Sequence, residues 1–175
     1  MDPLADLVRL GELVPPPDSP VRAWGDWKRF VSVNGFPPPD DYRMMIREYG
    51  VGTFAGWAML IEPFNPAFTF MNMVEDECRS LPVSASGLAR FPQPGGFLPW
   101  AVTTTGGFIG WRTEGRNLSW PTVYWDRDGK ASVYPVGAVA FMVGLAQRSL
   151  GDARFDADGT NPFSKAKEPF TPATY

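Results

Sequence analysis

The chain has 175 residues, of which 44% are hydrophobic and 20% charged, with a net charge of −3 and a pI near 5.0. This composition is typical of one globular domain that buries a sizeable core, and it excludes a disordered chain. No run of lysine or arginine is present, so the charge pattern argues against a nucleic-acid-binding protein.

The first part of the chain predicts two helices separated by a proline-rich linker. Residues 3–13 predict a short helix, and the linker "VPPPDSP" follows at 14–20. The inward positions expected for the first helix are Leu4, Leu7, Val8 and Leu10. A second helix is expected from about Ser19, with Trp24, Trp27 and Val31 on one face and Asn34-Gly35 as its stop.

The segment "FPPPDDYRMMIREYG" has the clearest helix pattern. Prolines precede it, and Asp40 and Asp41 occupy the first turn, where the helix dipole favours negative charge. Its expected buried stripe is Tyr42, Met45, Ile46 and Tyr49. Gly50 is expected to end the helix in the left-handed conformation, and Gly52 to provide the backbone flexibility for the turn into the next strand.

Three glycines in "EYGVGTFAGW" also raise the question of a phosphate-binding loop. Such a loop leads from a strand into the N-terminus of a helix, whereas this one follows a helix C-terminus, where the dipole disfavours an anion. We therefore interpret the stretch as a structural corner. After it, "TFAGWAMLIEP" predicts one strand of about eight residues, apolar on both faces.

The remaining segments predict a helix, a loop and a β-rich second half. Residues 67–80 predict a helix with Glu75, Asp76 and Glu77 outward, and 80–96 a loop. Two strands are expected around Thr105-Gly106-Gly107, followed by a hairpin that turns at Asp126–Lys130. Residues 136–150 predict a helix that Gly151 stops, and its expected inward positions are Ala138, Phe141, Met142 and Leu145.

Residues 152–175 are polar and rich in turns, and they could pack through Phe155, Phe163 and Phe170 or remain loose. The order of elements along the whole chain predicts an α+β fold in a single domain.

Two acidic turns and two groups of adjacent carboxylates are candidate chemical sites. The turns "DRDGK" at 126–130 and "DADGTN" at 156–161 resemble calcium loops, but the twelfth positions are Gly137 and Lys167 in place of glutamate. We interpret both as Asx-type turns. The carboxylates at 40–41 and 75–77 occupy adjacent helical positions and do not converge, so we expect solvated helix surface.

The chain contains no histidine, and Cys78 is its only cysteine. These absences exclude Ser–His–Asp and Cys–His catalysis, an intrachain disulfide and a zinc knuckle. Asp2 and Asp6 lie where a signal peptide carries positive charge, and prolines interrupt the uncharged stretches at 91–111 and 131–147. The lack of histidine also lowers the expectation of catalysis. We expect a cytoplasmic protein with no membrane span, metal or cofactor, and Cys78 as a buried small residue.

Tryptophan is abundant, with seven residues in the chain. Those expected on or beside strands are Trp57, Trp100, Trp111, Trp120 and Trp125. Most must be core, but one layer of helices cannot easily cover aromatic side chains on both faces of every strand. One face is therefore a candidate for a binding concavity.

The order of these motifs resembles the SUKH superfamily, which includes yeast cell-wall-synthesis regulators and many bacterial immunity proteins. The similarity is carried by "FPPPDDYRMMIREYGVGTFAGWAMLIEP", "FLPWAVTTTGGFIGWRTEG" and "WPTVYWDRDGKASVYPVGAVAFMVGLAQRSLG". It covers residues 20–151, leaving a helix and linker at 1–19 and a tail at 152–175. The family often has an Asn-Gly-Asp type turn where this chain has Thr105-Gly106-Gly107.

The resemblance implies a mixed, mostly antiparallel sheet flanked by helices, and a protein-binding function without catalysis. Bacterial members are typically immunity proteins that neutralise a cognate toxin, frequently a nuclease, and the acidic charge suits a cationic partner. The candidate contacts are Trp57, Trp111 and Trp125 on the sheet and Asp126 and Asp128 at its rim. The alternatives are a regulatory scaffold for housekeeping proteins and a small-molecule-binding protein or histidine-free enzyme with a tryptophan-lined pocket.

Overall fold

A seven-stranded antiparallel sheet in the order β6-β5-β4-β3-β2-β1-β7 organises the chain. The computed structural model describes residues 2–79, 87–116 and 120–175. The strands are β1 (Gly52–Phe54), β2 (Ala58–Leu60), β3 (Phe97–Thr103), β4 (Phe108–Arg112), β5 (Thr122–Trp125), β6 (Ala131–Tyr134) and β7 (Phe170–Pro172). The helices are α1 (Pro3–Leu13), α2 (Trp27–Asn34), α3 (Asp40–Tyr49), α4 (Phe70–Cys78), α5 (Ala138–Gln147) and α6 (Ala153–Asp156), with a 3₁₀ turn, η2, at Pro162–Ser164.

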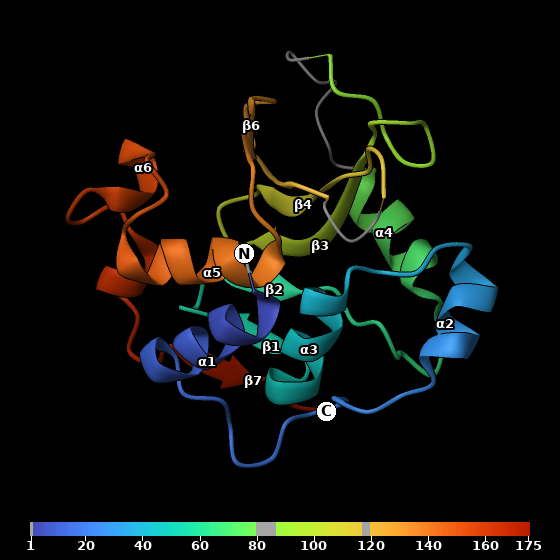
Figure 1. Cartoon of the computed structure of the whole chain (residues 1–175), viewed down its shortest axis with the longest axis horizontal. Coiled ribbons are helices and arrows are strands. Elements are labelled where there is room, and N and C mark those ends of the chain that lie inside the picture. Colours follow the sequence, from blue (N-terminus) through green and yellow to red (C-terminus); the bar gives the residue numbers. More distant parts are fainter. Residues whose placement is uncertain (1, 80–86, 117–119) are drawn as a thin grey trace.

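Helices α1, α3 and α5 pack against one another on one side of the sheet, while α2 and α4 lie together at one end and α6 at the other (Figure 1). Trp111 of β4 points to the helix side, where its ring centroid lies 5.0 Å from that of Tyr42 in α3. The opposite face is partly uncovered, because Met59 of β2 and Val133 of β6 are about half exposed. The predicted α+β class is confirmed.

Helix α3 forms as its pattern predicts. All four stripe residues (Tyr42, Met45, Ile46 and Tyr49) are buried, and the helix ends at Gly50. Gly50 has a positive φ of 67° but an extended ψ of −154°, so it is not the left-handed cap that the sequence predicts. A Cβ there would lie 2.3 Å from the carbonyl oxygen of Val21, so glycine also permits this close approach.

The single strand predicted after Gly50 is wrong: residues 52–60 form the tight hairpin β1–β2. Three residues, 55–57, connect the paired Phe54 and Ala58, and the N–H of Trp57 donates to the carbonyl oxygen of Phe54 at 2.8 Å. The two central residues of this turn, Ala55 and Gly56, both have positive φ, 53° and 61°. Gly52 lies within β1 and serves close packing, because a Cβ there would lie 2.5 Å from the ring of Phe170 in β7.

The N-terminal helices differ in detail from the sequence prediction. In α1, Leu10 is buried but Leu4 and Val8 are exposed. Helix α2 begins at Trp27, because the carboxylate of Asp26 caps it by accepting from the N–H groups of Lys28 and Arg29 at 2.8 and 3.1 Å. Trp24 therefore precedes the helix and is exposed, which corrects its predicted place on a buried helical face.

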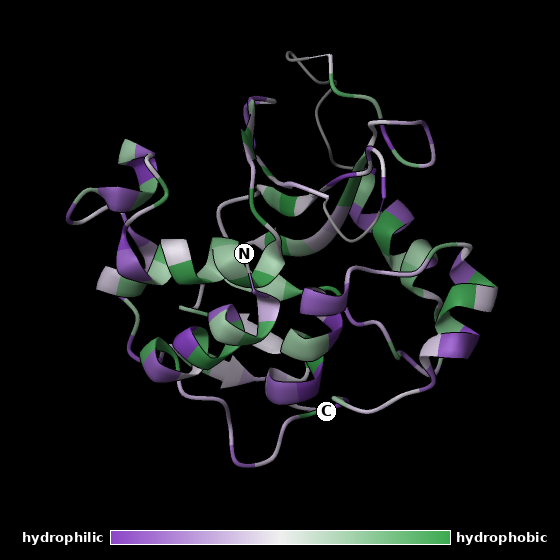
Figure 2. Cartoon of the chain, viewed as in Figure 1, coloured by the Kyte–Doolittle hydropathy of each residue, from purple (hydrophilic) through white to green (hydrophobic). Residues whose placement is uncertain are grey.

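The β-rich half and its closing helix agree with the prediction. The β3–β4 and β5–β6 hairpins turn at the predicted residues, and the four predicted inward residues of α5 are fully buried. Figure 2 shows α5 as apolar along most of its length, whereas α1 and α3 mix polar and apolar positions. The helix ends at Gln147, before the predicted stop at Gly151, because Arg148 already adopts a left-handed conformation.

Residues 152–175 are integrated into the domain. They form α6, η2 and β7, and β7 pairs with β1 in the register Phe54↔Phe170. Phe155 and Phe170 are buried, and Phe163 packs partly buried against the core. Tyr175 reaches back to donate a hydrogen bond to the buried carboxylate of Glu62 at 3.1 Å, and Arg22 bonds the same carboxylate.

Candidate functional site

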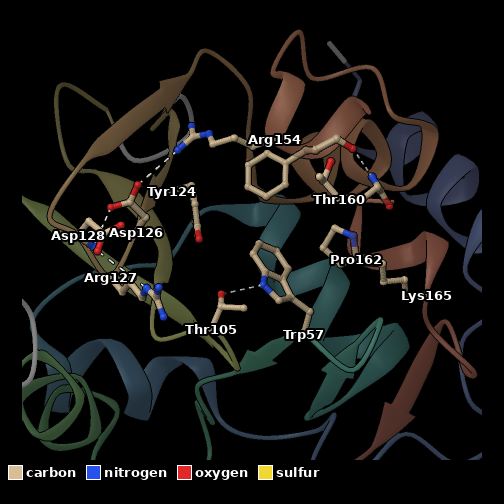
Figure 3. A pocket seen from close by; sticks show the side chains of 12 residues that line it. Trp57, Thr105, Tyr124, Asp126, Arg127, Asp128, Arg154, Thr160, Pro162 and Lys165 are labelled. Atoms are coloured by element: carbon tan, nitrogen blue, oxygen red, sulfur yellow. Dashed lines mark hydrogen bonds and ion pairs between the residues drawn. The ribbon is translucent and has the colours of Figure 1, made fainter. Parts of the chain in front are cut away.

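A pocket of about 440 Å³ lies where four segments distant in sequence meet (Figure 3). The contributing segments are the end of the β1–β2 turn, the β3–β4 turn, the β5–β6 hairpin and residues 154–165. We call it the Trp57 pocket, after the side chain at its base. Residues 154–165 supply one wall, so the C-terminal part of the chain completes the site.

Three aromatic rings form the floor of the Trp57 pocket. Trp57, Tyr124 and Phe155 are all buried, and their ring centroids lie 5.1 to 5.7 Å apart in tilted or edge-on arrangements. The indole N–H of Trp57 donates to the hydroxyl of Thr105 at 3.2 Å, which fixes the ring plane. Burial raises the pKa of Tyr124, so its phenol stays protonated at neutral pH. The floor is a rigid, mostly apolar surface.

Arg154 is held rigidly at the upper side of the Trp57 pocket. Its guanidinium donates to both carboxylate oxygens of Asp152, at 2.6 to 3.2 Å, and to the hydroxyl of Ser132 at 2.6 Å. The phenol of Tyr134 donates to the same Asp152 carboxylate at 2.6 Å. These hydrogen bonds, first of all those from Arg154, hold the pKa of Asp152 well below its usual range.

The β5–β6 hairpin forms the charged rim of the pocket. Asp126 closes this turn, because its Oδ1 accepts from the N–H groups of Asp128 and Lys130 at 3.0 and 2.9 Å. Its Oδ2 lies 3.6 Å from Nη1 of Arg154. Asp128 projects into solvent beside Arg127. The Asx-turn interpretation of "DRDGK" is confirmed.

The second acidic turn is also structural, though in a different way. The carboxylate of Asp156 accepts from the backbone N–H groups of Leu150, Gly151 and Asp152 at 2.7 to 3.0 Å, and so ties α6 to the end of α5. This is a cap on preceding residues and not the predicted Asx turn. Within the described ranges, no three Asp, Glu or Cys side chains gather as a metal ion would require.

The structure brings together three of the five predicted contact residues: Trp57, Asp126 and Asp128 all line the Trp57 pocket. The predicted contact role of Trp111 and Trp125 is wrong, because these side chains are 0% and 1% exposed and offer no surface to a partner. Trp111 packs against Tyr42 on the helix side, and Trp125 against Phe97 on the other face. The alternating pattern of the strands placed them on the sheet but did not reveal what covers each face.

A second hollow, of about 550 Å³, was missed by the sequence analysis. It lies between α2, residues 63–69 and the start of α4, and we call it the α2 groove. Its exposed apolar side chains are Trp24, Val33 and Phe68, at 69%, 53% and 62% exposure. The guanidinium of Arg47 lies 4.8 Å from the Trp24 ring and steadies it. The groove was not predicted because the sequence pattern placed Trp24 on the buried face of a helix, whereas it is exposed.

Comparisons of the chain with protein-family models, with curated proteins and with solved structures found no match. Among the described residues, none of the helices combines the length and apolar character that a membrane crossing requires.

Proposed function

We propose that the chain is a non-catalytic protein-binding module, and in particular an immunity protein that neutralises a cognate nuclease-type toxin. The observation that carries the binding role is the α2 groove with its exposed Trp24, Val33 and Phe68. Clustered apolar side chains on the surface of a folded protein commonly mark an interaction site, and tryptophan is prominent among binding hot spots. The immunity role rests on the SUKH resemblance.

The border of the α2 groove supports a protein partner. Asp26 and Arg29 are exposed charged residues of the groove lining, and Lys28 lies exposed beside them on α2. An apolar centre with a charged border is the usual anatomy of a protein interface. The net charge of −3 favours encounter with a cationic partner such as a nuclease, and the exposed Asp128 carboxylate is a candidate contact for it.

Co-expression with the protein encoded by the adjacent upstream gene tests this proposal. We expect a stable complex and restored growth of cells that carry the toxin. The double variant Trp24→Ala/Phe68→Ala should weaken the complex by at least about 30-fold, because loss of even one hot-spot aromatic costs about 2 kcal/mol. Val133→Ala is the matched control, since it shortens a half-exposed apolar side chain on β6, outside the groove.

Each outcome of this experiment has a distinct meaning. Absence of a complex and of growth rescue contradicts the immunity role. Capture of housekeeping proteins that bind through the groove, in place of a toxin, supports the regulatory-scaffold alternative. A toxin complex that is insensitive to the double variant contradicts the assignment of binding to the α2 groove, and Asp128→Asn then tests the rim of the Trp57 pocket.

A further inference from the structure

We infer that the Trp57 pocket is a binding site for a small aromatic carboxylic acid. Its volume of about 440 Å³ lies within the range of roughly 300–1,000 Å³ of small-molecule sites. Such sites combine apolar surface with a few precisely placed polar groups. Here the aromatic rings supply the apolar surface, and Arg154 is a polar group held in place by Asp152 and Ser132. This inference is independent of the α2 groove, which has no lining residue in common with the pocket.

The floor of the pocket suits a planar ring. Trp57, Phe155 and Pro162 all line the pocket, and the ring centroids of Trp57 and Phe155 lie 5.6 Å apart. Figure 3 shows Trp57 and Pro162 bordering the same space. Aromatic side chains prefer to contact another ring in offset or edge-on arrangements, and proline adds a flat apolar face. A ligand ring of one or two fused cycles would bury its faces against these groups.

The charges of the lining favour an acid over an amine. Arg154 is paired with Asp152 and faces Asp126, and Arg127 is beside Asp128. Lys165 lines the same pocket and, among the described residues, no carboxylate lies within ion-pair distance of its ammonium. A ligand carboxylate would thus supply the counter-ion of Lys165 and form a charge-assisted hydrogen bond.

An amine would find no equivalent partner. Oδ1 of Asp126 already accepts two backbone N–H groups, and its Oδ2 faces the Arg154 guanidinium. Asp128 projects away from the turn into solvent, with 83% of its side chain exposed. An ammonium ligand would instead meet Arg154 and Lys165 across the pocket, which disfavours it electrostatically.

The wall that carries Lys165 is preformed. Asn161 is fully buried, and its amide donates to the carbonyl oxygens of Leu145 and Phe155 at 2.7 and 2.5 Å. Its Oδ1 accepts from the N–H of Phe163 at 2.8 Å, which begins η2. A ligand therefore does not have to order this segment, and its affinity is not reduced by that cost.

Calorimetric titration with matched probes tests the inference. The acids are benzoate, phenylacetate and indole-3-acetate, and their controls are benzylamine, phenethylamine and tryptamine, which carry the same rings. We expect saturable binding of at least one acid, about tenfold tighter than its amine. Lys165→Ala should weaken acid binding by about tenfold, the low end of what loss of a charge-assisted hydrogen bond costs, because Lys165 is exposed. Lys167→Ala, an exposed lysine outside the pocket, should leave it unchanged.

Proton–nitrogen correlation spectra of the wild type should place the largest acid-induced shift at the indole N–H of Trp57. The inference would be overturned if none of the acids binds saturably at concentrations up to about 10 mM, a range that covers millimolar dissociation constants. Amines that bind as tightly as the acids, or a Lys165→Ala variant that binds like Lys167→Ala, would overturn it as well. None of these outcomes depends on whether a protein binds the α2 groove.

Discussion

Asp41 in the first turn of α3 caps the N-terminus of α5: its Oδ2 accepts a hydrogen bond from the backbone N–H of Val139 at 3.1 Å. The cap residue of α5 itself is Gly137, which has no side chain to satisfy these amides. A carboxylate from another helix thus performs the task that Ser, Asp or Asn usually performs locally. The contact joins two of the three helices that cover the sheet.

The Asp41 carboxyl should make stability depend on pH. Burial raises its pKa above the unfolded value of about 3.9. The protonated Asp41 carboxyl therefore contributes its full share of folding stability below about pH 4. The folded state loses this contribution as the pH rises through the folded pKa and the buried group ionises. Asp41→Asn keeps an acceptor without the charge, so urea unfolding from about pH 3 to 7 should show the variant gaining on the wild type.

Gly137→Ala should break the same contact from the other side. A Cβ at this position would lie 2.4 Å from Oδ2 of Asp41, so the carboxylate would have to leave the amides of α5. We expect a loss of about 2 kcal/mol in the free energy of unfolding, from the cap and from overpacking together. Gly11→Ala in α1, where a Cβ meets nothing within 4 Å, should instead stabilise by about 0.5–1 kcal/mol. Equal effects of the two variants in denaturant melts would contradict this assignment.

The Arg154–Asp152 pair should contribute to stability at the acid end. Since Arg154 lowers the pKa of Asp152, the contribution is present above about pH 3.9 and is lost as the pH falls through the folded pKa. Arg154→Gln should cost about 1 kcal/mol at pH 7, a value reduced for the partial exposure of the pair, and less at pH 2. Arg154→Lys keeps the charge but not the bidentate hydrogen bonding, so its stability should lie between those of the wild type and Arg154→Gln. Thermal unfolding at both pH values measures the difference.

Cys78 should be unreactive in the native protein. It is buried at the end of α4, and burial raises the pKa of its thiol to about 11. Because the thiolate is the reactive form, only about one molecule in a thousand carries it at pH 8. A thiol reagent such as Ellman's should therefore label the native chain very slowly and label it fully in guanidinium chloride. Rapid labelling without denaturant would show that α4 opens locally.

The fold was predictable where the sequence pattern and its local signals agree. The stripe of α3 and the turns of the later hairpins are such cases, because helix spacing, caps and glycines all act within a few residues. The β1–β2 hairpin was not predictable, since Ala55 adopts a positive φ that its side chain disfavours. Pairing of the two short strands with β3 and β7 imposes that conformation.

The candidate site was partly predictable for the same reason. Asp126 and Asp128 belong to a turn that can be recognised locally. Trp57 was a candidate only as a tryptophan on an expected strand, and the turn that positions it was not predicted. Arg154 and Lys165 come from a segment whose pattern predicts little, and only tertiary packing brings it to the hairpin. The burial of Trp111 and the exposure of Trp24 depend on which elements cover each surface, and a residue pattern does not contain that information.

The pairing of β7 with β1 has a consequence for how the chain folds as it is synthesised. Strand β1 is complete once Phe54 has left the ribosome, but its partner Phe170 is made much later. Until then β1 is an open edge whose unpaired N–H and C=O groups can recruit a strand from another chain. Its brevity, three residues, limits that hazard. A contact between residues so distant also predicts that closure of this edge is among the slow steps of folding.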